Sequence, residues 1–268
     1  MTATIFALDH LTAIETDPAG LIETADRSGF RRACSFVRSI EGLGGPDFNL
    51  SRYPEQLRAA TSAMAAHGVT LDIAYPFSLS GRSVTSDFLP DLEVAAALRA
   101  PLVNLLVYLR DESEILDKAS DFCAAAATVG LGVAIELAPV TSLKTLGQTA
   151  GLVRALARTG QVGVNLDVLH LYRSGGTPSD IAPYRADVLY AQLCDGALAR
   201  PADEWRDEGA LQRDRPGEGE MDLRNFLDAL SGVPISVEVP DQRRRLAGES
   251  AMDRASHTRL AAEKLSIL

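Results

Sequence analysis

Eight short apolar segments recur along the chain, and most of them are separated by longer amphipathic stretches. Apolar runs that alternate with helical patterns are typical of parallel strands joined by helical crossovers. Eight such units in 268 residues fit one (β/α)8 TIM barrel, whose usual length is about 250 residues. The sequence therefore predicts an α/β fold with a single barrel domain over residues 1–268. The strands are expected near residues 3–8, 33–37, 69–74, 102–108, 132–137, 162–167, 187–193 and 234–239.

Helix start and stop signals lie between the expected strands. Asp17 followed by Pro18 is typical of a helix start, and Gly29 is placed to end that helix. A second helix is expected from Pro54 to Gly68 for the same reasons. An open doubly wound sheet is the alternative fold, but the G-x-G-x-x-G fingerprint typical of it does not follow the first strand, in FALDHLTAIETDPAG. The closed barrel is therefore favoured.

Charge and cysteine content exclude several classes of function. The formal net charge is −10 and the pI is about 4.9, whereas nucleic-acid binding normally needs clustered Lys and Arg. The three cysteines form no C-x-x-C pair, no apolar run approaches the roughly 18 residues of a membrane span, and MTATIFALDH shows no targeting pattern. We therefore expect a cytoplasmic protein that binds a small molecule, with neither a nucleic-acid nor a membrane partner. Assembly into a homo-oligomer stays open.

Oxygen-bearing side chains occur at corresponding ends of the last four expected strands. Alternate side chains of a barrel strand face inward, and the last of them projects into the mouth, where this fold keeps its chemistry. Carboxylates are rarely buried there without a partner, because an unpaired buried charge costs several kcal/mol. A bound cation would compensate them together. The four residues are Glu136, Asp167, Gln192 and Glu238.

The donor atoms of these four side chains are all oxygen. Oxygen ligands suit a hard ion such as Mn²⁺ or Mg²⁺, whereas Zn²⁺ usually recruits His or Cys. We therefore predict one divalent ion, Mn²⁺ or Mg²⁺, with Co²⁺ and Zn²⁺ as alternatives. Any single strand-end carboxylate is more commonly a salt-bridged or capping residue, so the prediction depends on the whole set.

Two histidines near the expected strand ends are candidates for substrate binding. His170 follows Asp167 by three positions, which brings its ring back over the mouth, where it could bond a substrate oxygen. A loop histidine that stacks on neighbouring backbone is the simpler alternative. His10 comes directly after the first strand and is also expected on the mouth side.

A long charged segment, residues 195–221, follows the seventh strand and exceeds the usual connection length. After that strand it would lie over the barrel mouth. Arg213 or Arg215 in this segment could hold a substrate carboxylate or hydroxyl, although a solvated loop with acidic neighbours is the alternative. Arg173, in YRSGG, is interpreted as structural.

Five segments between residues 133 and 240 together resemble the xylose-isomerase-like TIM-barrel superfamily of sugar isomerases, epimerases and related dehydratases. The segments are AIELAP, NLDVLHLYRSGG, YAQLCDG, RDRPGEGEMDL and ISVEVP. The resemblance implies that His170 and Arg213 contact the substrate. It also implies a metal held by Glu136, Asp167, Gln192 and Glu238. Many members carry His where this chain has Gln192, whereas hydroxypyruvate-isomerase-like relatives carry Gln. The apurinic endonucleases of the superfamily use a histidine-rich zinc site, which an acidic chain with four histidines does not match.

The constellation and the resemblance imply a divalent-metal-dependent isomerase or epimerase of a sugar, keto-polyol or small hydroxy-keto acid. The ion would polarise a carbonyl and its neighbouring hydroxyl, so that Glu136 or Glu238 can remove the proton between them and form an enediolate. Loss of a β-hydroxyl from it would instead make the protein a dehydratase of a cyclic keto-polyol such as a keto-inositol or dehydroshikimate. A non-catalytic ligand-binding barrel is the third hypothesis.

Overall fold

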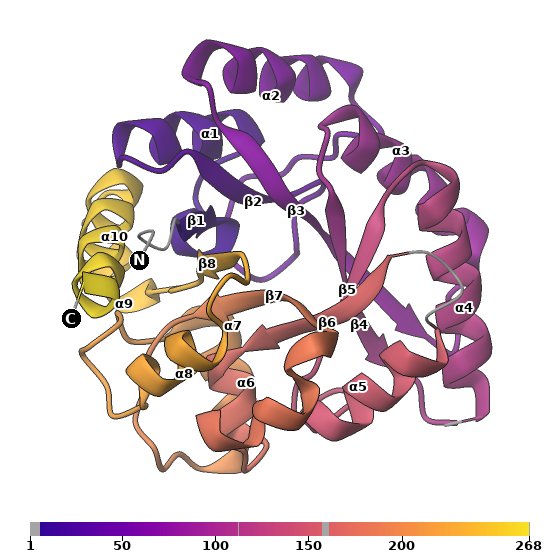
Figure 1. Ribbon diagram of the computed structural model, residues 1–268. Helices are drawn as coiled ribbons and strands as arrows, with labels where there is room; N and C mark the ends of the chain where they lie inside the picture. Colours follow the sequence, from indigo (N-terminus) through magenta and orange to yellow (C-terminus); the bar gives the residue numbers. More distant parts are fainter. Residues whose placement is uncertain (1–5, 112, 157–160, 268) are drawn as a thin grey trace.

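Eight parallel strands close into a barrel in the computed structural model, which describes residues 6–111, 113–156 and 161–267. Each strand pairs with its neighbour in sequence, and β1 pairs with β8 to complete the ring. Helices surround the strands (Figure 1). The predicted (β/α)8 fold is confirmed. The strands are β1 Phe6–Asp9, β2 Arg32–Phe36, β3 Thr70–Ser80, β4 Leu102–Tyr108, β5 Gly132–Glu136, β6 Val162–Asp167, β7 Val188–Leu193 and β8 Ile235–Val237.

The connections between the strands are mainly helical. The α-helices are α1 Pro18–Arg27, α2 Pro54–His67, α3 Leu89–Ala97, α4 Ser113–Thr128, α5 Leu146–Ala155, α6 Val168–Arg173, α7 Trp205–Leu211, α8 Leu223–Ala229, α9 Gln242–Leu246 and α10 Ala251–Ile267. Short 3₁₀ helices span His10–Ala13, Thr85–Phe88, Pro178–Asp180, Ala182–Asp187 and Ala202–Glu204.

The local signals in the sequence produce the expected helix ends. The Asp17 side chain accepts a hydrogen bond from the Gly20 backbone N–H at 2.8 Å, and Pro18 is the first residue of α1. Gly68 ends α2 with a φ of 65°, a left-handed conformation that costs glycine little.

Most strand boundaries agree with the sequence prediction, and residues 3–5 of the first expected strand lie outside the described residues. The exception is β3, which was predicted to end at residue 74 but continues to Ser80. Pro76 interrupts the apolar pattern, and the pairing with β4 shifts register between Ala74 and Phe77. Proline has no backbone N–H to donate to the ladder, so within a sheet it is tolerated mainly at such an irregularity.

The two faces of each strand are buried in different surroundings. Alternate residues such as Phe6 and Leu8 belong to the main hydrophobic cluster, which also contains helix residues such as Phe122. Residues of the opposite register form a separate cluster together with Phe48, which lies between β2 and α2. The strand members are Ala7, Cys34, Phe36, Ile73, Tyr75, Leu102, Ala134 and Tyr190. Since side chains alternate along a strand, the residue two positions after a member of this second cluster points the same way. That rule aims Asp9, Asn104, Glu136 and Gln192 along the barrel interior toward the carboxyl ends of the strands.

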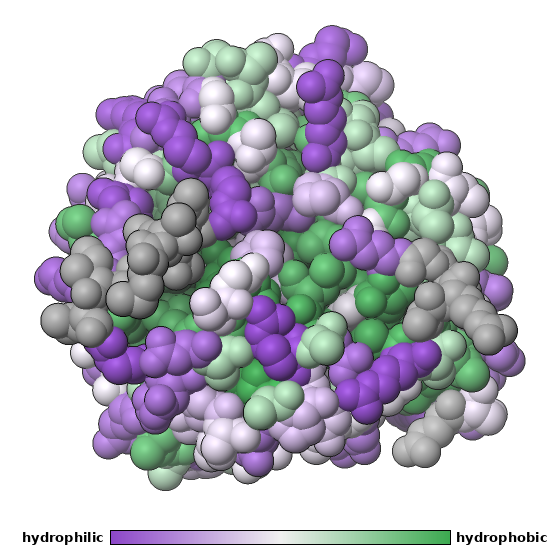
Figure 2. Space-filling view, in the orientation of Figure 1, coloured by the Kyte–Doolittle hydropathy of each residue, from purple (hydrophilic) through white to green (hydrophobic). Residues whose placement is uncertain are grey.

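The outer surface is polar, as the helix pattern predicts. In the space-filling view, hydrophilic residues cover much of the margin and apolar residues lie deeper toward the centre (Figure 2). Among the described helices, none is both long and apolar enough to cross a membrane. The three cysteines, Cys34, Cys123 and Cys194, are buried and form no disulfide.

The segment 195–221 is ordered by its own contacts. Asp195 and Asp214 exchange backbone hydrogen bonds at 2.9 and 3.0 Å, which closes the base of the segment. The Asp195 carboxylate also accepts backbone N–H bonds from Gly196, Gly217 and Met221. A Cβ at Gly219 would lie 2.3 Å from Asp195 Oδ1, so this close approach requires glycine. The segment was expected to be irregular, but it contains α7.

Candidate functional site

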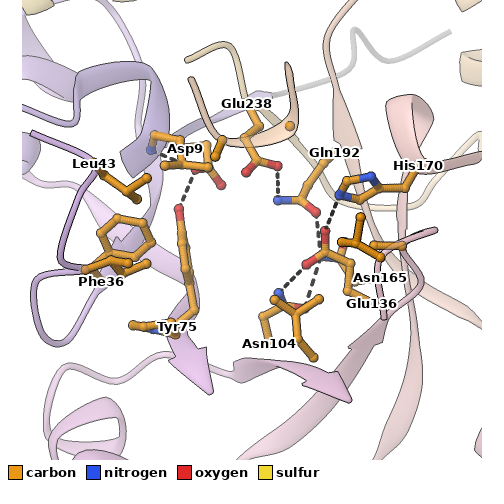
Figure 3. Close-up of a pocket in the computed structure, with 18 of the residues that line it drawn as sticks. Asp9, Phe36, Leu43, Tyr75, Asn104, Glu136, Asn165, His170, Gln192 and Glu238 are labelled. Atoms are coloured by element: carbon orange, nitrogen blue, oxygen red, sulfur yellow. Dashed lines mark hydrogen bonds and ion pairs between the residues drawn. The ribbon is translucent and has the colours of Figure 1, made fainter. Parts of the chain in front are cut away.

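A cavity of about 800 Å³ lies where the strands end. Its polar lining comes from strand-end side chains, with α7 and the loop after β2 contributing to the wall. In the close-up view the carboxylates and amides point into one space, bounded on one side by Phe36 and Leu43 (Figure 3). The acidic and amide side chains that line it from the strands or directly after them are Asp9, Asn104, Glu136, Asn165, Gln192 and Glu238.

Glu136, Asp167 and His170 form a compact group of candidate metal ligands. One ligand atom from each lies within 4.8 Å of the others. His170 Nε2 is 3.3 Å from Glu136 Oε1 and 3.9 Å from Asp167 Oδ2. Asp167 also caps α6, because its Oδ1 accepts the Leu169 N–H at 2.7 Å. The strand-to-helix turn therefore fixes the aspartate, and the first turn of α6 carries His170 back over the site, as the three-residue spacing predicts.

A chain of amides connects the other predicted ligands. Asn104 donates to Glu136 Oε2 at 2.5 Å, and Asn165 donates to Asn104 Oδ1 at 3.2 Å and to Gln192 Oε1 at 2.6 Å. Gln192 in turn donates from Nε2 to Glu238 Oε2. Since an amide in such a chain is oriented by both neighbours, Asn104 and Asn165 hold Glu136 and Gln192 in place. Sequence reasoning missed both asparagines.

Arg213 lies between two of the carboxylates. Its Nη1 is 2.6 Å from Asp167 Oδ2 and 3.3 Å from Glu238 Oε2, and its Nε donates to the Gly209 carbonyl at 3.0 Å. The arginine was predicted to bind substrate. It does line the cavity, and its contacts with Asp167 and Glu238 join segment 195–221 to β6 and to the end of β8.

Burial and charge shift the acidities of the site in different directions. Burial would raise the pKa of Asp167, but the Arg213 guanidinium and the His170 ring outweigh it and hold that pKa below its usual value. Burial raises the pKa of Glu238 well above its usual value; Arg213 offsets part of this, and Asp9, Asp167 and Glu136 add to it. The site therefore carries more negative charge than one guanidinium balances.

Asp9 is a functional candidate that sequence reasoning missed. It ends β1, is fully buried and lines the cavity. Its Oδ1 accepts hydrogen bonds from the Tyr75 hydroxyl and from the Leu11 N–H, the latter at 3.0 Å. Burial raises the pKa of Asp9 to about 7, and these hydrogen bonds offset only part of that effect. The signal was present in the sequence, because Asp9 ends its strand as Glu136 and Asp167 end theirs.

His10 does not reach the cavity. The ring is fully buried, stacked 4.8 Å from Phe36, and both nitrogens contact the backbone. Nδ1 accepts the Phe36 N–H at 3.0 Å, which leaves Nε2 to donate to the Thr16 carbonyl at 3.0 Å. Burial lowers the pKa of His10 to about 4, so the ring is neutral. It was predicted to bind substrate, but its ring nitrogens are occupied by backbone groups, and the structure gives it a packing role.

The side chains fit a divalent cation. Glu136, Asp167 and Glu238 bring three carboxylates close together at low exposure, while Arg213 supplies a single positive charge. A hard dication is suited to this excess of buried oxygen donors. Glu238 and Gln192 belong to the same hydrogen-bonded network as the compact group. The residues therefore match the chemistry of a metal site, and His170 is a further ligand candidate beside the four predicted from the strand ends.

Known structures resemble this chain over nearly its whole length. The IolI protein, solved with a bound zinc atom, is 18% identical with a TM-score of 0.77, and the match covers 98% of both chains. The D-allulose 3-epimerase of a Methylomonas species is 12% identical with a TM-score of 0.70, covering 98% of this chain and 97% of the other. The probable 3-DHS dehydratase AsbF of Bacillus anthracis is 13% identical with a TM-score of 0.73, covering 96% and 98%. Identities this low show a shared fold.

One similar structure is much longer than this chain. It is a fusion of a xylose isomerase-like TIM barrel with a 4-hydroxyphenylpyruvate dioxygenase, 21% identical with a TM-score of 0.78. The match covers 97% of this chain but 42% of the fusion. No curated protein sequence matches the chain. The model of the xylose isomerase-like TIM barrel family matches residues 36–261, and the chain therefore belongs to that family.

Proposed function

We propose that this chain is a divalent-metal-dependent isomerase or epimerase of a sugar, keto-polyol or small hydroxy-keto acid. The observation that carries the proposal is the placement of two glutamates in one cavity. Glu136 ends β5 and Glu238 follows β8, so they reach the cavity from strands three places apart around the barrel. The fold shared with D-allulose 3-epimerase supports the same reaction class.

The two glutamates would do the proton transfer. A divalent ion held by Glu136, Asp167, Gln192 and Glu238, Mn²⁺ or Mg²⁺ by the hardness of the donors, would polarise a substrate carbonyl and acidify the adjacent C–H bond. One glutamate removes that proton, and the other returns a proton from its own side. Return to the opposite face of the same carbon gives epimerisation, and return to the neighbouring carbon gives isomerisation.

The surrounding side chains prepare the glutamates for this role. Asn104 donates a hydrogen bond to Glu136 Oε2, so that Glu136 Oε1 faces His170. Gln192 does the same for Glu238 Oε2. Groups already held in one orientation need little rearrangement in the transition state. His170 and Arg213, which both line the cavity, would contact substrate oxygens.

Deuterium exchange tests the proposal. The Mn²⁺-loaded protein should exchange the C–H proton next to the carbonyl of a ketose such as D-allulose in D₂O, as followed by NMR. Glu136→Gln should remove the exchange, whereas Glu93→Gln, at an exposed position of α3, should leave it unchanged. Exchange that persists in Glu136→Gln would contradict the assignment. Protein purified without chelator that holds no divalent ion and gains no stability from Mn²⁺ would favour a ligand-binding barrel instead.

A dehydratase of a cyclic keto-polyol is the second candidate, favoured by the apolar side of the cavity. Phe36, Ile40, Leu43 and Ile73 line it, and such a surface packs against a ring better than against a fully hydroxylated open chain. The fold shared with the probable dehydratase AsbF supports this class. Loss of water from a cyclic keto-polyol would be followed by ultraviolet absorption of the enone. Absorption without proton exchange into recovered substrate would favour the dehydratase.

A further inference from the structure

The strongest unexplained feature of the cavity is one oxygen of Asp9. Oδ1 of this carboxylate has two hydrogen-bond donors, Tyr75 and the Leu11 N–H. Oδ2 is buried and has no hydrogen-bond partner in the part of the chain that the structure describes. A buried carboxylate oxygen left without a donor costs roughly 1–3 kcal/mol. Because Asp9 lines the cavity, a ligand there can supply the missing hydrogen bond.

The carboxylate is held too firmly to turn its free oxygen elsewhere. The Tyr75 hydroxyl donates to Asp9 and accepts a hydrogen bond from the backbone N–H of His10 at 3.2 Å. The Tyr75 ring meets the Phe36 ring edge-on, with centroids 4.4 Å apart. Asp9 is thus fixed by a neighbour that is fixed in turn, and Oδ2 is presented in one direction.

A second aspartate–tyrosine pair in the same barrel shows what a purely structural arrangement looks like. Asp72 Oδ2 accepts the Tyr190 hydroxyl at 3.1 Å and also lies 3.1 Å from Arg32 Nη1. Asp72 does not line the cavity. Here a guanidinium compensates the carboxylate, whereas Asp9 has no ion-pair partner within 4.0 Å among the described residues.

The side chains around Asp9 favour a hydroxyl group over a phosphate as the group that Asp9 binds. In the close-up view Asp9 and Tyr75 lie beside Phe36 and Leu43, across the cavity from Glu136 and His170 and next to Glu238 (Figure 3). A hydroxyl group both donates and accepts, so it can bond Oδ2 whether Asp9 is ionised or protonated. A fully ionised phosphate only accepts hydrogen bonds, and its charge would be repelled by the ionised form of Asp9.

We propose that Asp9 is a substrate-binding residue whose Oδ2 binds an uncharged substrate hydroxyl, and that it makes the cavity select neutral polyols over their phosphate esters. The assignment rests on the proposed function, since it places the substrate's reacting carbons near Glu136 and its hydroxyl-bearing end near Asp9. Tyr75 acts through Asp9 as a positioning residue. The apolar neighbours keep water away from this hydrogen bond and so strengthen it.

Selectivity of binding tests the proposal. Calorimetry with the Mn²⁺-loaded protein would compare D-allulose and D-fructose with D-fructose 1-phosphate and D-fructose 6-phosphate. The wild-type protein should bind the neutral ketoses at least tenfold more tightly. Asp9→Leu should weaken ketose binding about tenfold or more. Asp9→Asn keeps an oxygen for Tyr75 and removes the charge, so the preference for neutral ketoses should fall about tenfold.

The matched control is Asp72→Asn, which neutralises the structural aspartate and should leave the preference within threefold of wild type. Thermal unfolding would confirm that each variant is folded, and Asp9→Asn keeps the test decisive if Asp9→Leu fails to fold. An unchanged preference in Asp9→Asn, an equal change in Asp72→Asn, or a wild-type protein that binds no ketose or prefers the phosphate esters would overturn the proposal. If the preference for neutral ketoses depends on Asp9 but the protein catalyses no proton exchange, the isomerase assignment is contradicted and the binding role of Asp9 stands.

Discussion

Two buried arginine clusters of similar composition lie near the barrel mouth, and they differ in their balance of charge. In the first, Arg173 forms a two-point ion pair with Glu208, with both N–O distances at 2.7 Å, and Arg200 approaches the same glutamate at 2.8 Å. In the second, Arg213 lies between Asp167 and Glu238. Arg200 also pairs with Glu204 at 3.1 Å, so the first cluster has two cations for two anions, whereas the second has one cation for two anions.

The difference in charge balance indicates a structural role for the Arg173 cluster and a binding role for the Arg213 cluster. Arg173 uses its remaining donors on the backbone carbonyls of Ala197 and Leu198, so its cluster is complete and anchors segment 195–221 to α6. The sequence-based interpretation of Arg173 as structural agrees with these contacts. The Arg213 cluster has Glu136 and Asp9 as further acidic neighbours, so it lacks positive charge. A buried group of carboxylates in that state is a place for a cation or a substrate.

Replacing Glu208 in the first cluster and Glu136 beside the second should give opposite phenotypes. The loss of proton exchange on replacing Glu136 is the largest effect we expect. Glu136→Gln, beside the Arg213 cluster, keeps the shape of the side chain but cannot take up a proton. Proton exchange should fall by about 10³-fold or more, with little change in the urea midpoint of unfolding. NMR in D₂O and urea titration would measure the two quantities. A large loss of stability without loss of exchange would reverse our interpretation.

Glu208→Gln should act the other way, on the free energy of unfolding. It leaves the buried Arg173 guanidinium without its carboxylate, which typically costs about 3–5 kcal/mol. Arg154→Met removes the exposed partner of Asp187 and should cost at most about 1 kcal/mol. Urea unfolding of both variants checks the contrast, and equal costs would show that burial of the Glu208 cluster is unimportant.

His10 extends the comparison to a buried site that is complete without any charge. Burial lowers the pKa of His10 from 6.5 to about 4, so the unfolded chain binds more protons than the folded protein between these values. Stability from His10 is therefore fully present above about pH 6.5 and is lost as the pH falls toward 4, by about 3 kcal/mol in total. Asp9, whose pKa is raised to about 7, has the opposite dependence in this window.

The His10 contribution can be isolated by difference. His10→Gln has no ring to protonate, so the gap in unfolding free energy between wild type and variant should shrink as the pH is lowered from 7 to 4. Denaturant unfolding at several pH values measures the gap. A gap that stays constant would mean that the His10 ring takes up a proton as readily in the folded protein as in the unfolded chain.

Metal binding is the smallest of these effects and the most direct probe of the charge imbalance. Mn²⁺ at about 100 times its dissociation constant should stabilise the protein by about 2.7 kcal/mol, seen as a higher Tm that EDTA reverses. Asp167→Asn should remove most of the shift, whereas Glu208→Gln should keep it. An equal shift in Asp167→Asn would place the ion elsewhere.

Residues near strand ends were predictable from sequence because strand geometry alone places them. Glu136, Asp167, Gln192 and Glu238 are predicted in this way, and the structure joins them through one network of hydrogen bonds and ion pairs. Asn165 was within reach of the same argument, since it lies two positions before Asp167 and so shares its face.

Contacts between distant segments were not predictable. Arg213 meets Asp167 across 46 residues of sequence, and a charged loop gives no sign of which arginine turns inward. Tyr75 was missed because Pro76 made β3 look finished at residue 74, whereas the strand continues through an irregular register. His10 was placed at the mouth by its position after β1, but its role is decided by the Phe36 N–H and the Thr16 carbonyl.

The hydrogen-bonded base of segment 195–221 has a consequence for how such a chain can change. The segment leaves and returns through the paired backbones of Asp195 and Asp214, and between them α7 contributes Trp205, Arg206 and Leu211 to the cavity wall. Insertions or exchanges between these two anchor points that keep Arg213 alter the wall, while the strand ends that Arg213 contacts stay where they are. Replacing part of this segment is therefore the simplest way to change which substrate the barrel binds, since the acidic residues beneath it would not have to move.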